Sequence, residues 1–240
     1  MSPRVLVISP TYEERDNLPR FVAALFEVLP EASLLVIDDA SPDGTGELAD
    51  EMAAADPRIA VLHRARKLGL GSAYVEGFRH ALRHGYDVTL EMDTDLSHDA
   101  RHLPSFLDAI AQGADVVVGS RNIPGGGVVG WGLGRHVISA GGSLYARTIL
   151  GVPTRDLTTG YKAYTRHALE TIGVEELRSS GYSFQVETTY RALRRGLRVV
   201  EVPIVFVDRR VGRSKLSRGV FLEAVWAVWH LRLEALRGRI

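Results

Sequence analysis

The chain has 240 residues, of which 45% are hydrophobic and 24% are charged, a composition typical of one globular domain with a substantial core. Its 29 Lys and Arg residues balance 29 Asp and Glu residues, so overall charge does not draw the chain to nucleic acid and any anion site must be local. Cysteine is absent, which excludes disulfides and thiolate metal sites and favours a reducing compartment. We find neither a signal peptide nor the ~18–20 apolar residues of a spanning helix, so we expect neither export nor a transmembrane anchor.

Short β-branched runs alternate with segments of helical periodicity through the first 120 residues. In residues 18–29, for example, Phe21, Leu25, Val28 and Leu29 recur at helical spacing. This alternation predicts βαβ units, and therefore an α/β fold with a mostly parallel sheet and helices on both of its faces. The predicted strands span residues 5–9, 34–38, 59–63, 88–93 and 115–120, and the predicted helices span residues 18–29, 46–55, 72–84 and 103–112.

A glycine-rich stretch between Gly125 and Gly134 separates this region from the rest of the chain, and we expect it to form a flexible connection. Beyond it the pattern predicts a helix over residues 136–150, a β-like piece over 160–164, a helix over 182–195 and a strand over 198–206. The sequence shows no internal repeat and no low-complexity linker. We therefore expect one compact domain over residues 1–240.

Polar clusters follow several of the predicted strands, at residues 10–14, 38–44, 93–95 and 121–122. Because ligands of parallel α/β sheets bind at the carboxyl ends of the strands, these clusters mark a candidate site. Asp, Ser, Pro and Gly also make turns and helix caps, and this remains an alternative for Pro42 to Gly44. Turns do not require paired carboxylates, so the acidic pairs favour a binding role.

The acidic pair Asp93 and Asp95 ends the strand predicted over residues 88–93. Alternate positions of an extended chain point the same way, so both carboxylates can project beyond the sheet edge. Two like charges this close are costly unless a positive charge lies between them. A hard divalent cation with open positions for phosphate oxygens resolves that conflict. His98 is a further candidate ligand, with a capping or turn role as the alternative.

The ordered set of motifs, which covers nearly the whole chain, resembles the inverting GT-A glycosyltransferases. The nearest branch is the dolichol-phosphate (polyprenol-phosphate) mannose synthases. The motifs that carry the resemblance are Pro10-Thr11-Tyr12, Asp38-Asp39 with Ser41 to Thr45, Gly69-Leu70-Gly71, Met92 to His98, Gly119-Ser120-Arg121, Gly127 to Trp131 with Arg135 and Ser139, Asp156-Leu157-Thr158, Glu201 to Ile204, Val207-Asp208-Arg209, and Gly212 with Ser214-Lys215-Leu216.

The resemblance implies a GDP-mannose donor, a polyprenyl or dolichyl phosphate acceptor and a divalent metal, Mg or Mn. By residue-wise correspondence, Pro10, Tyr12, Glu14, Ile37 and Asp39 would hold the guanosine, and Asp93, Thr94, Asp95 and Ser97 would lie at the diphosphate, with Asp93, Asp95 and Ser97 as metal ligands. Arg121, Arg135 and Ser139 would meet the acceptor phosphate or the transferring sugar, and Arg209 and Lys215 would close over the diphosphate. Glu13, Thr94 and Ser97 depart from the family's usual Asn, Ala and Gln.

The same resemblance divides the domain into a nucleotide-sugar-binding half over residues 1–120 and an acceptor-binding half over residues 121–218, followed by a helix over residues 219–240. Residues 208–218 hold five Arg or Lys side chains and one acid, which predicts a local anion site or, as the alternative, a solvated basic loop. Gly212 and Ser214 in that segment favour a mobile lid.

A phosphate acceptor explains why no general base is evident. Alcohol acceptors need a carboxylate or His to remove a proton, whereas a phosphate monoester, with a second pKa of about 6, is largely dianionic at neutral pH. Single displacement would then give a β-linked lipid phosphate from an α-linked donor. A UDP-glucose-dependent relative with the same acceptor is the close alternative, and a catalytically inactive nucleotide-sugar-binding module is the other. The motifs of a Rossmann oxidoreductase and of a Gly-x-Ser-x-Gly hydrolase are absent.

The last predicted helix carries an apolar stripe at steps of four, three, four and three residues, formed by Leu222, Trp226, Trp229, Leu233 and Leu236. A wide apolar face with Trp and nearby Arg is typical of a helix lying in a membrane interface. A cover for the core or for a partner subunit is the alternative. We expect a cytoplasmic protein attached peripherally to the cytoplasmic face of a membrane, with an integral membrane protein as a candidate anchoring partner and no nucleic-acid partner.

Overall fold

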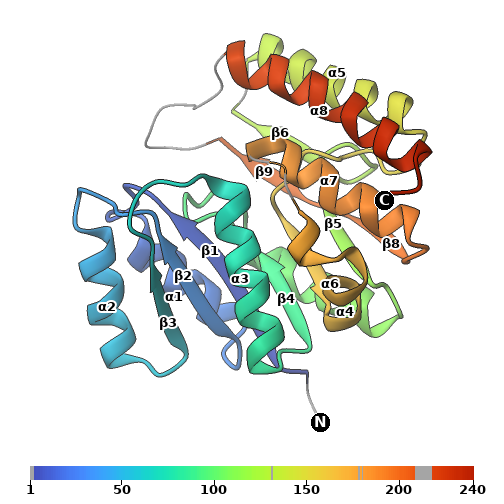
Figure 1. The fold of residues 1–240 in the computed structure, drawn as a ribbon. Helices are drawn as coiled ribbons and strands as arrows, with labels where there is room; N and C mark the ends of the chain where they lie inside the picture. Colours follow the sequence, from blue (N-terminus) through green and yellow to red (C-terminus); the bar gives the residue numbers. More distant parts are fainter. Residues whose placement is uncertain (1–2, 131, 178, 180, 209–217) are drawn as a thin grey trace.

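A computed structural model describes residues 3–130, 132–177, 179, 181–208 and 218–240 (Figure 1). The strands are β1 (Val5–Thr11), β2 (Ser33–Asp38), β3 (Ile59–His63), β4 (Val88–Glu91), β5 (Val116–Ser120), β6 (Gly127–Val129), β7 (Lys162–Thr165), β8 (Val199–Pro203) and β9 (Val205–Val207). The helices are α1 (Leu18–Val28), α2 (Thr45–Ala55), α3 (Leu70–His84), α4 (Leu103–Ala111), α5 (Leu133–Leu150), α6 (Arg166–Ile172), α7 (Gly181–Arg194) and α8 (Arg218–Leu236), with short 3-10 turns η1 (Ala100–His102) and η2 (Val174–Glu176).

Within the described chain the central sheet has seven strands in the order β3-β2-β1-β4-β7-β5-β8. All neighbouring strands pair in parallel except β7, which runs antiparallel to both β4 and β5. The α/β fold and the mostly parallel sheet predicted from the sequence are confirmed. One continuous sheet therefore joins the two predicted halves of the domain.

Both faces of the sheet are covered by helices, and the alternation of β1 shows why. Val5 and Val7 belong to one buried cluster with α1, α2 and α4, whereas Leu6 and Ile8 belong to a second cluster with α3, α6 and α7. Because successive strand residues point to opposite faces, a continuous apolar run is required when both faces are buried. The two cores together fix the edge of the sheet where the polar clusters lie.

A third apolar cluster joins α5, α7 and α8, which lie side by side above the sheet in Figure 1. Helix α8 contributes Val228, Leu231 and Ala235 to this cluster. The stripe predicted from the sequence lies on the side of α8 away from this cluster, and its residues Trp226, Trp229, Leu233 and Leu236 are exposed. The side chain of Leu222 lies outside the described residues.

Two predicted segments differ from the structure. The strand predicted over residues 198–206 is divided into β8, in the central sheet, and β9, which pairs in parallel with β6. The break falls at Ile204, whose N–H donates to the carbonyl of Ser120 and whose carbonyl accepts the N–H of Gly127. The predicted glycine-rich connection contains β6, and Gly134 lies inside the first turn of α5.

Sequence reasoning also missed α6, which follows β7 directly. Its N-cap is Thr165, whose hydroxyl accepts the N–H of Ala168. None of the helices in the described ranges is long and apolar enough to cross a membrane.

Candidate active site

The candidate site lies where the order of the strands reverses. The chain passes from β1 outward to β2 and β3 and then returns to place β4 on the other side of β1. In open α/β sheets, ligands bind in the crevice beyond the carboxyl ends of the strands at such a switch point. The segments that follow β1, β2 and β4 at this edge carry the acidic clusters singled out in the sequence.

Backbone strain is concentrated at the same edge. Among the described residues, the non-glycine positions with positive φ are Glu13 at 59°, Ala40 at 53° and Leu96 at 61°. They follow β1, β2 and β4, and each such conformation costs on the order of 1–3 kcal/mol and persists only where the surrounding structure holds it. The N–H of Glu13 donates to the hydroxyl of Ser41, which in turn donates to Asp38. Strain that recurs on three adjacent loops is typical of a binding site.

The acidic pair lies in the segment after β4, and each carboxylate has a defined neighbour. Tyr74 donates its hydroxyl to Oδ1 of Asp93 at 3.3 Å, and Oδ1 of Asp95 accepts the N–H of Ser97 at 3.0 Å. Asp95 and Ser97 are buried, and Asp93 is half-buried. Oγ of Ser97 is buried without a hydrogen-bond partner among the described atoms.

This set of oxygen donors fits a hard divalent cation that takes its remaining ligands from phosphate and water. Within the described ranges, no group of three or more His, Cys, Asp or Glu side chains is arranged to hold a metal by itself. Two carboxylates and one orphaned hydroxyl are the number of protein ligands expected when substrate phosphates complete the coordination.

Thr94 and His98 anchor the loop that carries the acidic pair. The hydroxyl of Thr94 lies 2.6 Å from that of Ser9 on β1, so Thr94 turns inward rather than toward a ligand. Nδ1 of His98 accepts the N–H of Asp93 at 3.3 Å, and its ring stacks on Tyr161 with centroids 4.7 Å apart. These contacts favour the turn role of His98 over the role of metal ligand.

The predicted nucleoside side centres on Asp39, which forms a buried ion pair with Arg64. The second carboxylate oxygen of Asp39 accepts the N–H groups of Leu68 and Gly69, both at 3.3 Å. Sequence reasoning missed Arg64, although it directly follows the strand predicted over residues 59–63, and the strand-end rule that found the acidic pairs would have found it as well. The ring of Tyr12 lies under Nζ of Lys67, 3.5 Å from the ring centroid.

The other residues predicted to hold guanosine differ in position. The side chain of Ile37 is fully buried in the second core cluster, so the structure does not bring it to the site surface; only its backbone can reach a ligand. The alternation of β2 turns this side chain into the core, and the contact of Ile37 with guanosine stays a prediction for its backbone. Pro10 is partly exposed in β1, and Glu14 accepts a hydrogen bond from Asn17 at the start of α1.

Asp43 supports the turn alternative for residues 42–44. Its Oδ1 accepts both the N–H and the hydroxyl of Thr45, the first residue of α2. Its Oδ2 accepts the N–H of Arg15. Burial raises the pKa of Asp43, but these hydrogen bonds outweigh burial and lower it. Asp43 therefore stabilises the loop as an ionised cap.

On the predicted acceptor side, Arg121 is held by Asp156. Its Nε and Nη2 donate to the two oxygens of that carboxylate, both at 2.7 Å, and Nη2 also donates to Thr158. Asp156 is fully buried, and Glu201 accepts its N–H. Burial acts to raise the pKa of Asp156, but the charge and hydrogen bonds of Arg121 outweigh it and lower the pKa. The guanidinium is thereby fixed in one orientation.

The remaining predicted residues are placed less completely. Arg135 lies in the first turn of α5, and its side chain is outside the described residues; Ser139 lies one turn further along and is partly buried. Arg209 and Lys215 lie outside the described residues. Their roles stay predictions.

Glu91 and Lys162 are two titratable side chains buried beneath the acidic loop. They are register partners on β4 and β7, and both are fully buried. Burial raises the pKa of Glu91 to about 7 and lowers the pKa of Lys162 to about 8, each opposed by the charge of the other. Nζ of Lys162 donates to the carbonyl of Gln185 and the hydroxyl of Thr188, which ties β7 to α7.

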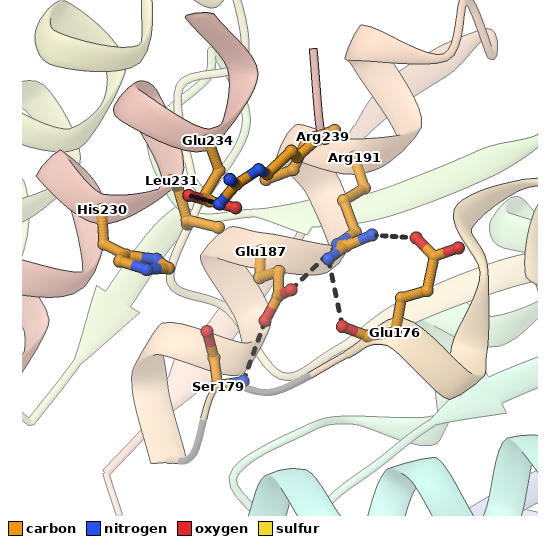
Figure 2. A pocket seen from close by; sticks show the side chains of 9 residues that line it. Glu176, Ser179, Glu187, Arg191, His230, Leu231, Glu234 and Arg239 are labelled. Carbon is orange, nitrogen blue, oxygen red and sulfur yellow. Dashed lines mark hydrogen bonds and ion pairs between the residues drawn. The ribbon is translucent and has the colours of Figure 1, made fainter. Parts of the chain in front are cut away.

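A cavity of about 410 Å³ lies elsewhere, between η2, α7 and α8 (Figure 2). Its charged side chains pair with one another: Arg191 contacts Glu176 and Glu187, and Glu234 contacts Arg239. We interpret this cavity as part of the packing between α7 and α8, because each of its Glu and Arg side chains is already engaged in an ion pair.

The mostly parallel sheet with helices on both faces is the GT-A fold of glycosyltransferases. The profile of glycosyl transferase family 2 matches residues 6–173, and the protein belongs to that family. Undecaprenyl-phosphate mannosyltransferase of Micrococcus luteus is 51% identical over 241 residues, which cover 99% of this chain and 99% of that protein. Polyprenol monophosphomannose synthase of Mycolicibacterium smegmatis is 49% identical over 240 residues, which cover 98% of this chain and 91% of that protein.

Solved structures confirm the fold. A mannosyltransferase of Pyrobaculum calidifontis, in complex with GDP-Man and Mn2+, has a TM-score of 0.65 at 20% identity; the match covers 99% of this chain and 65% of that one. Glucosyl-3-phosphoglycerate synthase of Mycobacterium tuberculosis, in complex with Mn2+, UDP and phosphoglyceric acid, has a TM-score of 0.69 at 18% identity, over 96% of this chain and 78% of that one.

Proposed function

We propose that this glycosyltransferase moves mannose from GDP-mannose to a polyprenyl phosphate and produces a polyprenyl-phosphate β-mannose. The observation that carries the proposal is the identity of about half of all residues, over nearly the full length, with two enzymes named for mannosyl transfer to polyprenyl phosphate. The acidic loop at the switch point supplies a place for the diphosphate of the donor.

Asp93 and Asp95 hold the divalent cation, Mg or Mn, in this proposal, and the orphaned hydroxyl of Ser97 is the third candidate ligand. When bound, the cation offsets the negative charge that develops on the departing nucleotide. Asp39, held by Arg64, and Tyr12 face the nucleoside. Arg209 and Lys215 are proposed to close over the diphosphate.

The acceptor needs no general base. Its phosphate is largely ionised at neutral pH and can attack the sugar directly, provided that nearby cations offset its repulsion from the donor. Arg121, Arg135 and Ser139 are proposed to supply this environment. The buried carboxylate of Asp156 stays ionised and bonded to Arg121, so it orients a cation rather than removing a proton.

Transfer with labelled GDP-mannose and polyprenyl phosphate tests the proposed chemistry. We expect a β-linked product by NMR, loss of transfer in excess chelator, and loss of at least ~100-fold in Asp95→Asn, because a bound cation stabilises the developing charge by several kcal/mol and each ~1.4 kcal/mol is tenfold in rate. Asp99→Asn is the matched control, since that carboxylate pairs with Arg101 instead. An α-linked product would contradict single displacement, and full activity of Asp95→Asn in chelator would contradict the metal site.

We also propose that the protein lies on the cytoplasmic face of a membrane through the exposed stripe of α8. Trp226 is 74% exposed and Leu236 is 69% exposed, and Leu144 of the neighbouring helix α5 is exposed as well. The opposite side of α8 already packs in the third core cluster, so the stripe is not needed to cover the core. Trp side chains favour the interface between water and lipid, where the phosphate of a prenyl acceptor lies.

Flotation with anionic vesicles tests whether the exposed stripe of α8 attaches the protein to a membrane. We expect the intact chain to float with the vesicles, Trp226→Ser/Trp229→Ser to stay in solution, and Trp226→Phe/Trp229→Phe to float, since it keeps aromatic area. All three proteins should bind GDP equally. Equal flotation of the Ser variant would contradict the assigned face, and a chain that never floats alone would favour the proposed integral partner.

A further inference from the structure

We propose that Tyr74 is a positioning residue that holds the carboxylate of Asp93 in the orientation required for cation binding. The inference rests on the proposed metal site. Tyr74 lies on α3, far from the acidic pair in sequence, and its hydroxyl donates to Oδ1 of Asp93 at 3.3 Å. A phenol is protonated at neutral pH, so the hydroxyl is the donor and the carboxylate the acceptor.

The ring of Tyr74 is itself held in place. It is fully buried and stacks on Phe184 of α7, with centroids 5.9 Å apart and planes at 9°. Phe78, one turn further along α3, packs against both rings, with its centroid 6.4 Å from that of Tyr74 and 6.1 Å from that of Phe184. A Cβ added to Gly71 would come within 2.7 Å of the carbonyl of Ser179, which shows how closely α3 approaches the segment before α7. The hydroxyl therefore cannot follow Asp93 if the carboxylate turns away.

The first turn of α3 is anchored on the nucleoside side of the same site. Arg64, the partner of Asp39, donates to the hydroxyl of Ser72 at 2.6 Å and to the carbonyl of Gly69 at 3.0 Å. Tyr74 lies only two residues beyond Ser72. One helix thus contacts Asp39 through Arg64 and contacts Asp93 directly, so it fixes the spacing between the two carboxylates.

A carboxylate beside a second carboxylate needs such a restraint. Without a cation, Asp93 and Asp95 repel each other, and rotation of Asp93 away from Asp95 would relieve the repulsion. Hydrogen bonds from residues behind a metal ligand keep the ligand oriented, and loss of such a bond typically costs 10–100-fold in metal affinity. The bond from Tyr74 engages one of the two oxygens of Asp93 and so restricts this rotation.

Binding of Mn2+ in the presence of saturating GDP, followed by EPR without acceptor, tests the role of Tyr74. We expect Tyr74→Phe, which keeps the stacked ring, to weaken Mn2+ binding by about 10-fold. Tyr164→Phe is the matched control, because Tyr164 is equally buried, packs on Phe78 and donates to Thr188 instead of Asp93. We expect it to bind Mn2+ within about twofold of the natural chain.

Two further readouts separate positioning from loosened packing. The Mn2+ concentration for half-maximal transfer should rise about 10-fold in Tyr74→Phe, while kcat at saturating Mn2+ stays within about twofold. In an Asp93→Asn background, Tyr74→Phe should have no further effect on Mn2+ binding. Unchanged Mn2+ binding by Tyr74→Phe, or an equal loss in Tyr164→Phe, would overturn the inference. Failure of the natural chain itself to bind Mn2+ with GDP would instead overturn the proposed metal site.

Discussion

Arg121 and Asp156 form the buried ion pair on which the predicted acceptor side depends. Replacing Arg121 with Met leaves the fully buried Asp156 without its cation, and we expect a loss of about 3–5 kcal/mol in the free energy of unfolding. Because Asp156 has a lowered pKa when folded, its stabilisation is present above the pKa of the unfolded chain and is lost as pH falls. Urea unfolding should therefore show the deficit of Arg121→Met shrinking below about pH 4.

The double variant Arg121→Met/Asp156→Asn is the control for this pair. Removal of both charges should cost less than the sum of the single changes, since neither charge is left buried alone. Additive losses would show that the two side chains act independently.

The stability contributed by Glu91 changes with pH in the direction opposite to that of Asp156. Burial raises its pKa to about 7 from an ordinary value of 4.5, so the folded chain holds a proton that the unfolded chain has released. The stabilising contribution of Glu91 to the free energy of unfolding is fully present below pH 4.5 and is lost as pH rises through 7. Glu91→Gln should match the natural chain at pH 5 and exceed it by about 2 kcal/mol at pH 8, measured by urea unfolding. A constant difference across this range would contradict the assignment.

Asp93 and Asp95 could be predicted from sequence because both requirements of the site are local. The residues follow a strand, and their spacing places two like charges together. The partners that hold them could not be found in that way. In the sequence, Tyr74 is only a core-facing residue of a predicted helix and Ser9 only a residue of a predicted strand. Their hydroxyls reach the loop only through the packing of α3 and β1 against it.

At the scale of helices and strands, α8 shows the limit of periodicity. Apolar residues recur on more than one side of this helix, so the sequence pattern identified a genuine stripe but not the side that is buried. Packing against α5 and α7 selected Val228, Leu231 and Ala235 instead of the stripe with Trp226 and Trp229. The strand predicted over residues 198–206 is divided in the structure, because a change of sheet at Ile204 leaves the apolar pattern intact.

Gly77 and Gly141 both lie within helices, and together they allow the effect of helix propensity on stability to be distinguished from the effect of packing. A Cβ added to Gly77 of α3 would come within 2.7 Å of two carbons of the buried Ile8, whereas one added to Gly141 of α5 meets nothing within 4 Å. We expect Gly77→Ala to destabilise the fold by about 1–3 kcal/mol, despite the better helix former. Gly141→Ala should stabilise it by about 0.5–1 kcal/mol. Thermal unfolding of both variants checks the contrast, and the same sign for both would contradict it.

For the whole molecule, the alternation of strands and helices was sufficient to predict a mostly parallel sheet with helices on both faces. The order of the strands was not predictable in the same way. The antiparallel strand β7 enters between β4 and β5, and its position depends on contacts with strands distant in sequence. This insertion also brings Lys162 opposite Glu91, so the pairing of these two buried side chains could not be recognised before the sheet was known.

The proposed function requires GDP-mannose as the donor and a polyprenyl phosphate as the acceptor. The direct measurement incubates the protein and Mn2+ with labelled GDP-mannose or labelled UDP-glucose, each with and without polyprenyl phosphate, and counts the label that butanol extracts. We expect extractable label from GDP-mannose that depends on polyprenyl phosphate, and at most background label from UDP-glucose. Extractable label from UDP-glucose and none from GDP-mannose would contradict the proposed donor.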